Sequence, residues 1–263
     1  MSVLAIDIGN SRIGAGVLTH GKSIDPAVRV AHAQADSDLP TLLRALWEKA
    51  QAASQEADDG VAGVVIASVN PQWTTRVEAM VEREINAAAE VIGRDLAAPI
   101  KTVLRDETTV GQDRLLGALA SYVNVEKACV IVQLGSALVV DCVDDEGIFR
   151  GGAIAPGLQM AARALHAFAA QLPEVSLTPP EESTPYGRYT QEAINLGIYA
   201  GARGTVRELV ERYAAALGAW PHVVATGGDA SAVLSESGLV DSFVPDLVLQ
   251  GAALAWEHKR MMS

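Results

Sequence analysis

Two stretches of the chain share one arrangement of apolar and polar positions. In each, an apolar run leads to a polar residue, an apolar residue, a glycine and a small polar residue, and a second apolar run follows. The stretches are SVLAIDIGNSRIGAGVLT at 2–19 and ACVIVQLGSALVVDCV at 128–143. Aligning Gly9 with Gly135 gives an offset of 126 (135 − 9), close to half of the 263 residues. Each stretch predicts a β-hairpin, and the offset predicts a duplicated domain with one hairpin opening each half.

The segments after each hairpin have the periodicity of alternating helices and strands. In the first half, helical spacing covers about 39–55 and 71–85, and strand-like apolar runs cover 63–69 and about 89–92. In the second half, helical spacing covers 157–172, 190–217 and 249–260, with a strand pattern at 222–226 and a short helix after it. The segment 172–189, rich in Pro, Glu and Ser, predicts a loop. We therefore expect two α/β lobes with mixed sheets and a cleft between them, covering 1–118 and 119–263.

Composition and charge restrict the partners. About half of the chain is hydrophobic (49%), so a substantial core is expected. A net charge of −12 with scattered basic residues argues against nucleic acid, which clustered Lys and Arg bind. An anionic substrate therefore needs backbone N–H groups, a few arginines or a bound cation. The sequence has no 18-residue apolar run and no signal-peptide pattern, so we expect no membrane association and a cytoplasmic location.

The two cysteines, Cys129 and Cys142, lie on opposite arms of the second hairpin. Their apolar neighbours favour small buried core residues over a disulfide, and no C-x-x-C spacing indicates a metal site.

The segment 16–23, GVLTHGKS, matches the P-loop pattern G-x-x-x-x-G-K-S. A P-loop needs a helix to begin at the lysine, but Ser-Ile-Asp-Pro follows here and resists a helix. We interpret 16–23 as the end of a strand and a hairpin turn.

The loop of the first hairpin, Asp7-Ile8-Gly9-Asn10-Ser11, has two interpretations. It is either a plain turn, or a phosphate-binding clip in which Asp7 holds a hydrated Mg²⁺.

The segment Gly111-Gln112-Asp113-Arg114 stands at the start of a predicted helix. There Asp113 is either a helix cap or a base that deprotonates a hydroxyl beside an anionic group.

Two glycine-rich segments precede predicted helices. GGAIAPG at 151–157 is either a flexible entry, with Pro156 near the first helical position, or a source of free N–H groups for phosphate. TGGD at 226–229 follows a strand, a common place for a nucleotide. Each of these signals is short.

Together and in this order, D-x-G-N-S, S-V-x-P (68–71), G-x-D-R, G-S-A…D, G-G-x-I-x-P-G and T-G-G-D resemble the type III pantothenate kinases across nearly the whole chain. The resemblance implies duplicated ribonuclease-H-like domains of the actin-like ATPase type. It implies transfer of the γ-phosphoryl group of ATP to pantothenate, the first step of coenzyme A synthesis. It also implies a homodimer that uses Mg²⁺ and a monovalent cation, K⁺ or NH₄⁺.

The same resemblance implies residue roles. Asp7 organises Mg²⁺, Asp113 is the general base, Arg114 contacts the substrate, and Gly111 shapes the substrate pocket. Thr190 reaches the substrate from the dimer partner, although its position is also that of a helix N-cap. The implied ATP and phosphate contacts are Asp7, Gly9, Asn10, Ser11, Gly135, Ser136, Gly152, Gly157, Thr226, Gly227 and Gly228.

The chain departs from the family pattern at several positions. Gln133 stands where the family has the aspartate of the monovalent-cation site, and Leu138 and Val139 follow where polar residues are usual. Leu104 and Glu107 replace a tyrosine and a proline ahead of G-Q-D-R. A neutral amide binds a cation less well than a carboxylate, so we predict weak ATP binding and little dependence on K⁺. The alternative is a non-enzymatic paralogue that binds a ligand in a regulatory or accessory role; the intact G-Q-D-R favours the kinase.

Overall fold

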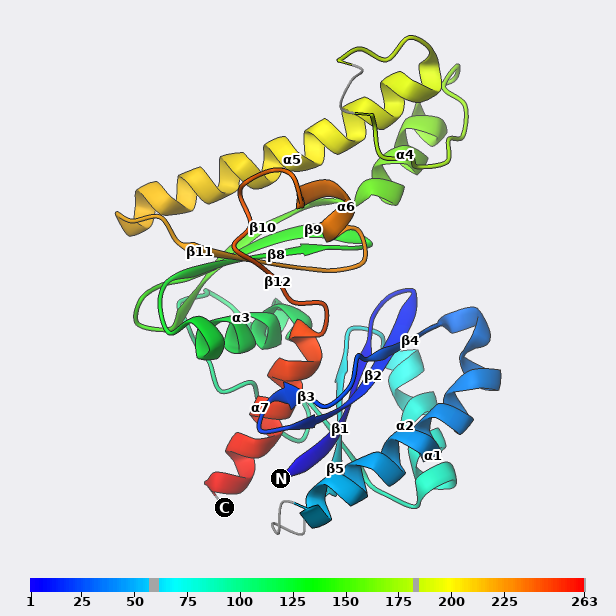
Figure 1. Ribbon diagram of the computed structural model, residues 1–263, viewed down its shortest axis with the longest axis vertical. Coiled ribbons are helices and arrows are strands. Elements are labelled where there is room, and N and C mark those ends of the chain that lie inside the picture. The colour runs from blue at the N-terminus through cyan, green and yellow to red at the C-terminus, as the bar shows by residue number, and fades with distance from the viewer. Residues whose placement is uncertain (57–61, 182–184, 263) are drawn as a thin grey trace. The chain divides into compact units, whose positions relative to one another are not determined.

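The computed structural model describes residues 1–56, 62–181 and 185–262 (Figure 1). Contacts divide the chain into two compact units, Met1–Asn124 with Asp246–Ser263, and Val125–Pro245. The sequence-based ranges 1–118 and 119–263 differ from this division, chiefly because the last helix belongs to the first unit. None of the helices in the described part is long and apolar enough to cross a membrane.

The first unit is a mixed sheet between two helical layers. Its strands have the order β3-β2-β1-β5-β6, with β4 beside β2. Their bounds are β1 Ser2–Ile8, β2 Arg12–Thr19, β3 Lys22–Ser23, β4 Val28–Ala31, β5 Ala62–Ser68 and β6 Ala89–Val91. The helices are α1 His32–Glu56, α2 Pro71–Ile85, α3 Gln112–Val125 and α7 Leu247–Met261. A short strand, β7 Lys101–Thr102, and a 3₁₀ turn, Glu107–Thr109, precede α3.

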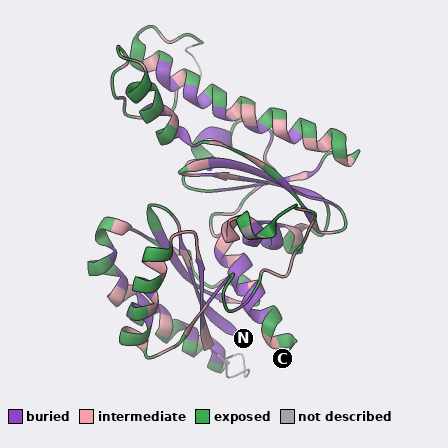
Figure 2. Cartoon of the chain, turned by 180° about the vertical axis from the view of Figure 1, so that it is seen from behind, coloured by how far each residue is buried: buried purple, intermediate pink, exposed green. Residues whose placement is uncertain are grey.

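Alternation along β1 explains this layering. Leu4 and Ile6 pack in a core with α1 and α2, whereas Val3 and Ala5 pack in a second core with α3 and α7. Helix α1 begins seven positions before the predicted range and passes through Pro40. In Figure 2 the central strands are buried and the helices expose their outer faces.

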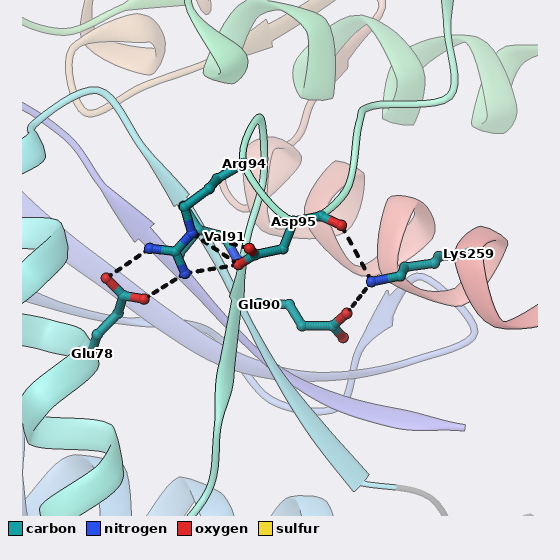
Figure 3. Close-up of polar contacts among 6 residues, drawn as sticks. All are labelled: Glu78, Glu90, Val91, Arg94, Asp95 and Lys259. Carbon is teal, nitrogen blue, oxygen red and sulfur yellow. Dashed lines mark hydrogen bonds and ion pairs between the residues drawn. The ribbon is translucent and has the colours of Figure 1, made fainter.

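Helix α7 is fixed to the first unit at several points. Trp256 is fully buried and its ring takes the space that a side chain at Gly63 would need. Arg260 lies 3.6 Å above the Trp256 ring and binds Glu90 at 2.6 Å. Figure 3 shows Lys259 on the same carboxylate, with the Glu78–Arg94–Asp95 ion pairs beside it. These contacts explain why the chain returns to complete its N-terminal unit.

The second unit has a sheet with the strand order β12-β11-β8-β9-β10. Its strands are β8 Cys129–Leu134, β9 Ala137–Val143, β10 Ile148–Pro156, β11 His222–Thr226 and β12 Ser242–Phe243. Its helices are α4 Leu158–Phe168, α5 Thr190–Leu217 and α6 Ala230–Leu234. The segment between α4 and α5 contains no helix or strand in its described residues, 169–181 and 185–189, as the loop prediction requires.

The two sheets repeat one pattern of pairing. Strand β1 pairs antiparallel with β2 and parallel with β5, and β8 pairs antiparallel with β9 and parallel with β11. Asp7 and Gln133 occupy equivalent positions, since Asp7 pairs with Ala67 on β5 and Gln133 with Thr226 on β11. Both predicted hairpins and the duplicated mixed α/β fold are therefore confirmed.

Strand β10 was missing from the sequence-based prediction. Gly151 and Gly152 were interpreted as the entry to a helix, but Gly152 pairs with Asp141 on β9. A Cβ at Gly152 would overlap the Asp141 carboxylate and the Val140 carbonyl, so glycine is needed for close strand packing rather than for flexibility. Pro156 ends this strand, and Gly157 is the N-cap of α4, so Pro156 is not the first helical residue.

Two further predictions are confirmed. The segment 16–23 contains the end of β2, a turn with positive φ at His20 and Gly21, and β3, so no helix begins at Lys22. Cys142 lies opposite Val130, one position after Cys129, so the two buried thiols point to opposite faces of the sheet and are free. Burial raises the pKa of Cys129 to about 12, as expected for an unreactive core thiol.

Candidate active site

The Gly9-Asn10-Ser11 loop lies between β1 and β2 and forms the turn of the first hairpin. The Gly9 N–H donates to the Arg12 carbonyl at 3.0 Å, which closes the turn, and the Asn10 and Ser11 residues are exposed. The His32 N–H donates to the Ser11 carbonyl at 3.1 Å and ties the loop to the start of α1. The loop is thus a true hairpin turn, and its two polar side chains remain available to a ligand.

Asp7 occupies the α3-facing side of the sheet, because it has the same parity along β1 as Val3 and Ala5. Burial, and then the charge of Asp113, raise the pKa of Asp7 to about 7, and Arg29 opposes this rise. The fold therefore brings Asp7 and Asp113, which are far apart in the sequence, into one electrostatic environment.

Asp113 is the second residue of α3, so Gly111 rather than Asp113 occupies the cap position. The Arg114 N–H donates to Asp113 Oδ1 at 2.9 Å. Burial raises the pKa of Asp113, and this hydrogen bond and the Arg114 charge oppose the rise. A Cβ at Gly111 would overlap Asp113 Oδ1 and would lie 3.9 Å from Val69 Cγ1. Glycine at 111 therefore leaves room for the carboxylate beside the S-V-x-P segment.

The S-V-x-P segment forms a rigid junction between β5 and α2. The Val69 N–H donates to the Ile8 carbonyl at 3.1 Å, next to the Gly9-Asn10-Ser11 loop. Ser68 Oγ accepts from the Asn70 N–H at 3.0 Å and from Thr74 Oγ1 at 2.7 Å. This network fixes the strand end that lies beside Asp7.

Most of the candidate residues of the second unit gather where β8 and β11 end. Gly135 and Ser136 form the hairpin turn, and the Gly135 N–H donates to the Ala137 carbonyl at 3.0 Å. A Cβ at Gly157 would overlap the Gly135 and Ser136 carbonyls, so the start of α4 packs directly on this turn. Gly152 is the exception, because it pairs with Asp141 in the middle of β10.

The T-G-G-D turn reaches the same place from β11. Gly227 has a φ of +101°, and a Cβ there would overlap the backbone of Leu134. The Asp229 N–H donates to the Leu134 carbonyl at 3.2 Å. Gly227 and Gly228 are exposed and Thr226 is buried, so the two glycines present backbone at the surface of this turn.

The residues of β8 and β9 that depart from the family pattern, Gln133, Leu138 and Val139, lie on two different faces of the sheet. Leu138 packs in the core with α5, so an apolar residue there serves the fold. Val139 pairs directly with Gln133, on the opposite face. The face that carries Gln133 therefore lacks both the acid and a polar neighbour at 139.

Thr190 is the first residue of α5, and Tyr189 rather than Thr190 is the N-cap. Thr190 is exposed and lines an apolar pocket of about 840 Å³ formed by β10, α4 and α5. Sequence reasoning did not find this pocket, because its walls come from three separate segments.

The described residues contain no group of three or more His, Cys, Asp or Glu side chains arranged to hold a metal. Asp7 and Asp113 are two neighbouring carboxylates beside an exposed loop. This arrangement fits Mg²⁺, which is usually bound by one or two carboxylates together with substrate phosphates and water.

Comparisons with known proteins identify the family and the fold. The family model for type III pantothenate kinase matches residues 3–212. A type III pantothenate kinase of Dehalococcoides mccartyi is 33% identical, covering 97% of each chain, and one of Frankia alni is 35% identical, covering 97% of this chain and 98% of its own. The solved activator of 2-hydroxyisocaproyl-CoA dehydratase from Clostridium difficile has a TM-score of 0.52 at 14% identity, covering 100% of this chain and 97% of its own, which indicates a shared fold. The chain belongs to the type III pantothenate kinase family.

Proposed function

We propose that this protein transfers the γ-phosphoryl group of ATP to the hydroxyl group of pantothenate, at the start of coenzyme A synthesis. The observation that carries the proposal is the meeting of Asp7 and Asp113 beside the exposed Asn10–Ser11 loop, with the pKa of both carboxyls raised. Phosphoryl transfer requires positioning and charge neutralisation more than covalent chemistry. Asp7 and Asp113 supply positioning, and Arg114 together with Mg²⁺ bound at Asp7 would supply charge neutralisation.

In the proposed mechanism, Asp113 accepts the proton of the pantothenate hydroxyl as the hydroxyl oxygen attacks the γ-phosphorus. The bond from the γ-phosphorus to the β–γ bridging oxygen breaks, and ADP leaves. Its raised pKa makes it a stronger base than an ordinary carboxylate. Arg114 binds the anionic end of the substrate. The exposed backbone and side chains of the Asn10–Ser11 turn contact the ATP phosphates. Asp7 holds Mg²⁺, which when bound neutralises charge on the phosphates.

The test is ADP release by the purified protein with pantothenate and Mg·ATP, coupled to a second enzyme. We expect turnover that depends on pantothenate. ATP binding without pantothenate-dependent turnover would instead support the accessory role of a non-enzymatic paralogue.

Gln133 carries a prediction about the monovalent cation. Its amide offers a carbonyl oxygen but no full charge, and its NH₂ group is able to donate directly to a phosphate oxygen. Initial rates of the wild type should change little with KCl at constant ionic strength. Gln133→Asp should create K⁺ activation, incomplete because Val139 stays apolar. Strong K⁺ activation of the wild type would contradict this charge argument.

We also propose that the protein is a homodimer whose contact covers the apolar pocket at Thr190. Phe168 is 91% exposed and Leu165 38% exposed in the lining of this pocket. A surface of this kind is typical of protein contacts. Phe168→Glu should convert a dimer to a monomer in light scattering, whereas Trp220→Glu, at an exposed position outside the pocket, should not. A monomeric wild type at micromolar concentration would contradict the proposal.

A further inference from the structure

Three residues on adjacent strands form a row across the sheet of the first unit. Asp7 on β1 pairs with Gly14 on β2, and Gly14 pairs with Arg29 on β4. A Cβ placed on Gly14 would lie 4.0 Å from Asp7 Cβ and 4.0 Å from Arg29 Cγ. Asp7 and Arg29 are thus on the same face of the sheet, and the missing side chain at Gly14 leaves nothing of that strand between them.

The Arg29 side chain is held by a residue from the far end of the chain. Arg29 Nη2 donates to Asp246 Oδ1 at 2.7 Å, and the Ala27 N–H donates to Asp246 Oδ2 at 3.3 Å. Both carboxylate oxygens of Asp246 therefore fix the β4 region, which carries Arg29. Asp246 is the N-cap residue of α7 and the point at which the chain re-enters the first unit.

An isolated surface ion pair contributes little to stability. The Arg29–Asp246 pair differs from such a pair in its setting, because the charge of Arg29 acts on Asp7. The charged groups that act on Asp7 are Asp113, from α3, and Arg29, from β4. Arg29 is thus a cation that offsets, at Asp7, the effect of the neighbouring Asp113 charge.

We propose that Arg29 is a positioning residue of the phosphoryl-transfer site, held by Asp246 so that its positive charge keeps the Asp7 carboxylate in place and attracts the polyphosphate of the nucleotide. This inference rests on the proposed kinase function and adds to it a residue outside the recognised motifs. Positive charge beside a site for Mg·ATP, which remains an anion, favours nucleotide binding. The effect should appear in nucleotide affinity more than in the affinity for pantothenate.

The experiment measures the dissociation constant for Mg·ATP by calorimetry, the KM for each substrate, and the melting temperature. Arg29→Met should raise the Mg·ATP dissociation constant about tenfold, and Arg29→Lys, which keeps the charge, less than about threefold. The matched control is Arg44→Met. Arg44 pairs with Glu84 at 2.7 Å in the same unit, with similar exposure (53% and 12% against 42% and 14%). This control should leave nucleotide binding unchanged.

A double variant that exchanges the charges of Arg29 and Asp246 distinguishes an electrostatic role of Arg29 at the nucleotide site from a purely structural role of the ion pair. In the double variant Arg29→Asp with Asp246→Arg, the ion pair is restored but a negative charge replaces the positive one beside Asp7. We expect the melting temperature to recover relative to the single variants while nucleotide binding stays at least about tenfold weaker. Recovery of both would overturn the inference, since the pair would then be only an anchor.

The measurements on Arg29→Met and on the wild type also distinguish a failure of this inference from a failure of the proposed function. If the wild type binds Mg·ATP and phosphorylates pantothenate while Arg29→Met does both equally well, the inference alone is wrong. If the folded wild type binds no nucleotide, both the function and the inference are wrong.

Discussion

Asp113→Asn should lower kcat for pantothenate phosphorylation by roughly 10²–10⁴, the usual contribution of a positioned general base. The amide keeps the size of the side chain but cannot accept the hydroxyl proton. Because Asp113 lies at the start of α3 beside Gly111 and Arg114 rather than in the nucleotide turns, the Mg·ATP dissociation constant should change by less than about threefold. Steady-state kinetics and calorimetry on the same preparations measure both quantities.

A matched control for this substitution is Asp25→Asn, which breaks an exposed ion pair with Lys49 and should leave kcat unchanged. Asp113→Glu should retain part of the activity, since a carboxylate remains within reach of the site. If Asp113→Asn turned over at a rate comparable with the wild type, the proton would have another acceptor and the proposed mechanism would be wrong.

Asp7→Asn should abolish productive binding of Mg·ATP and at the same time stabilise the fold. The pKa of Asp7 is raised from 3.8 to about 7, chiefly by burial. Between these values the unfolded chain is ionised and the folded protein prefers the neutral carboxyl. Asp7 therefore costs stability progressively as pH rises from about 4 to 7, and the full cost persists at higher pH.

The substitution should thus raise the free energy of unfolding by about 2–4 kcal/mol at pH 8, and by less than half as much at pH 5. Denaturant titrations at the two pH values measure the difference. If Asp7→Asn raised the free energy of unfolding equally at both pH values, the destabilisation by Asp7 would not arise from burial of its charge. Asn has nearly the same size and shape as Asp, so the substitution changes the charge and leaves the packing the same. The pKa of Asp113 is also raised, so Asp113→Asn should change the free energy of unfolding in the same direction.

The parts of the fold that were predictable from sequence are those encoded locally. Two apolar runs around a glycine predicted each hairpin, and the helical range 190–217 matches α5 Thr190–Leu217. Strand β10 was missed because Gly152 is selected by contact with Asp141 on another strand, which a local pattern does not reveal. Helix α1 begins at His32, seven positions before the predicted range, so the sequence pattern located this helix but not its start.

The candidate site divides in the same way. Asp7 and Asp113 were found because each lies in a short recognisable motif. Arg29 was not, since its strand is only four residues long and its partner Asp246 is 217 residues away in the sequence. The residues next to Arg29 in the sequence form no motif that indicates a functional role. Its position depends on the pairing of β1, β2 and β4 and on Asp246, the N-cap of the last helix.

The return of α7 has a consequence for protein synthesis. One face of the first sheet, with Val3 and Val65, is covered only in part, by α3, until Trp256 and its neighbours in α7 have left the ribosome. Residues 125–245 form a continuous unit, so they are complete while the N-terminal segment still waits for its last helix. The usual N-to-C order of co-translational folding is thereby reversed for this chain. A nascent chain that stalls before α7 would expose the apolar face beside Asp7, and would be a target for chaperones and proteases.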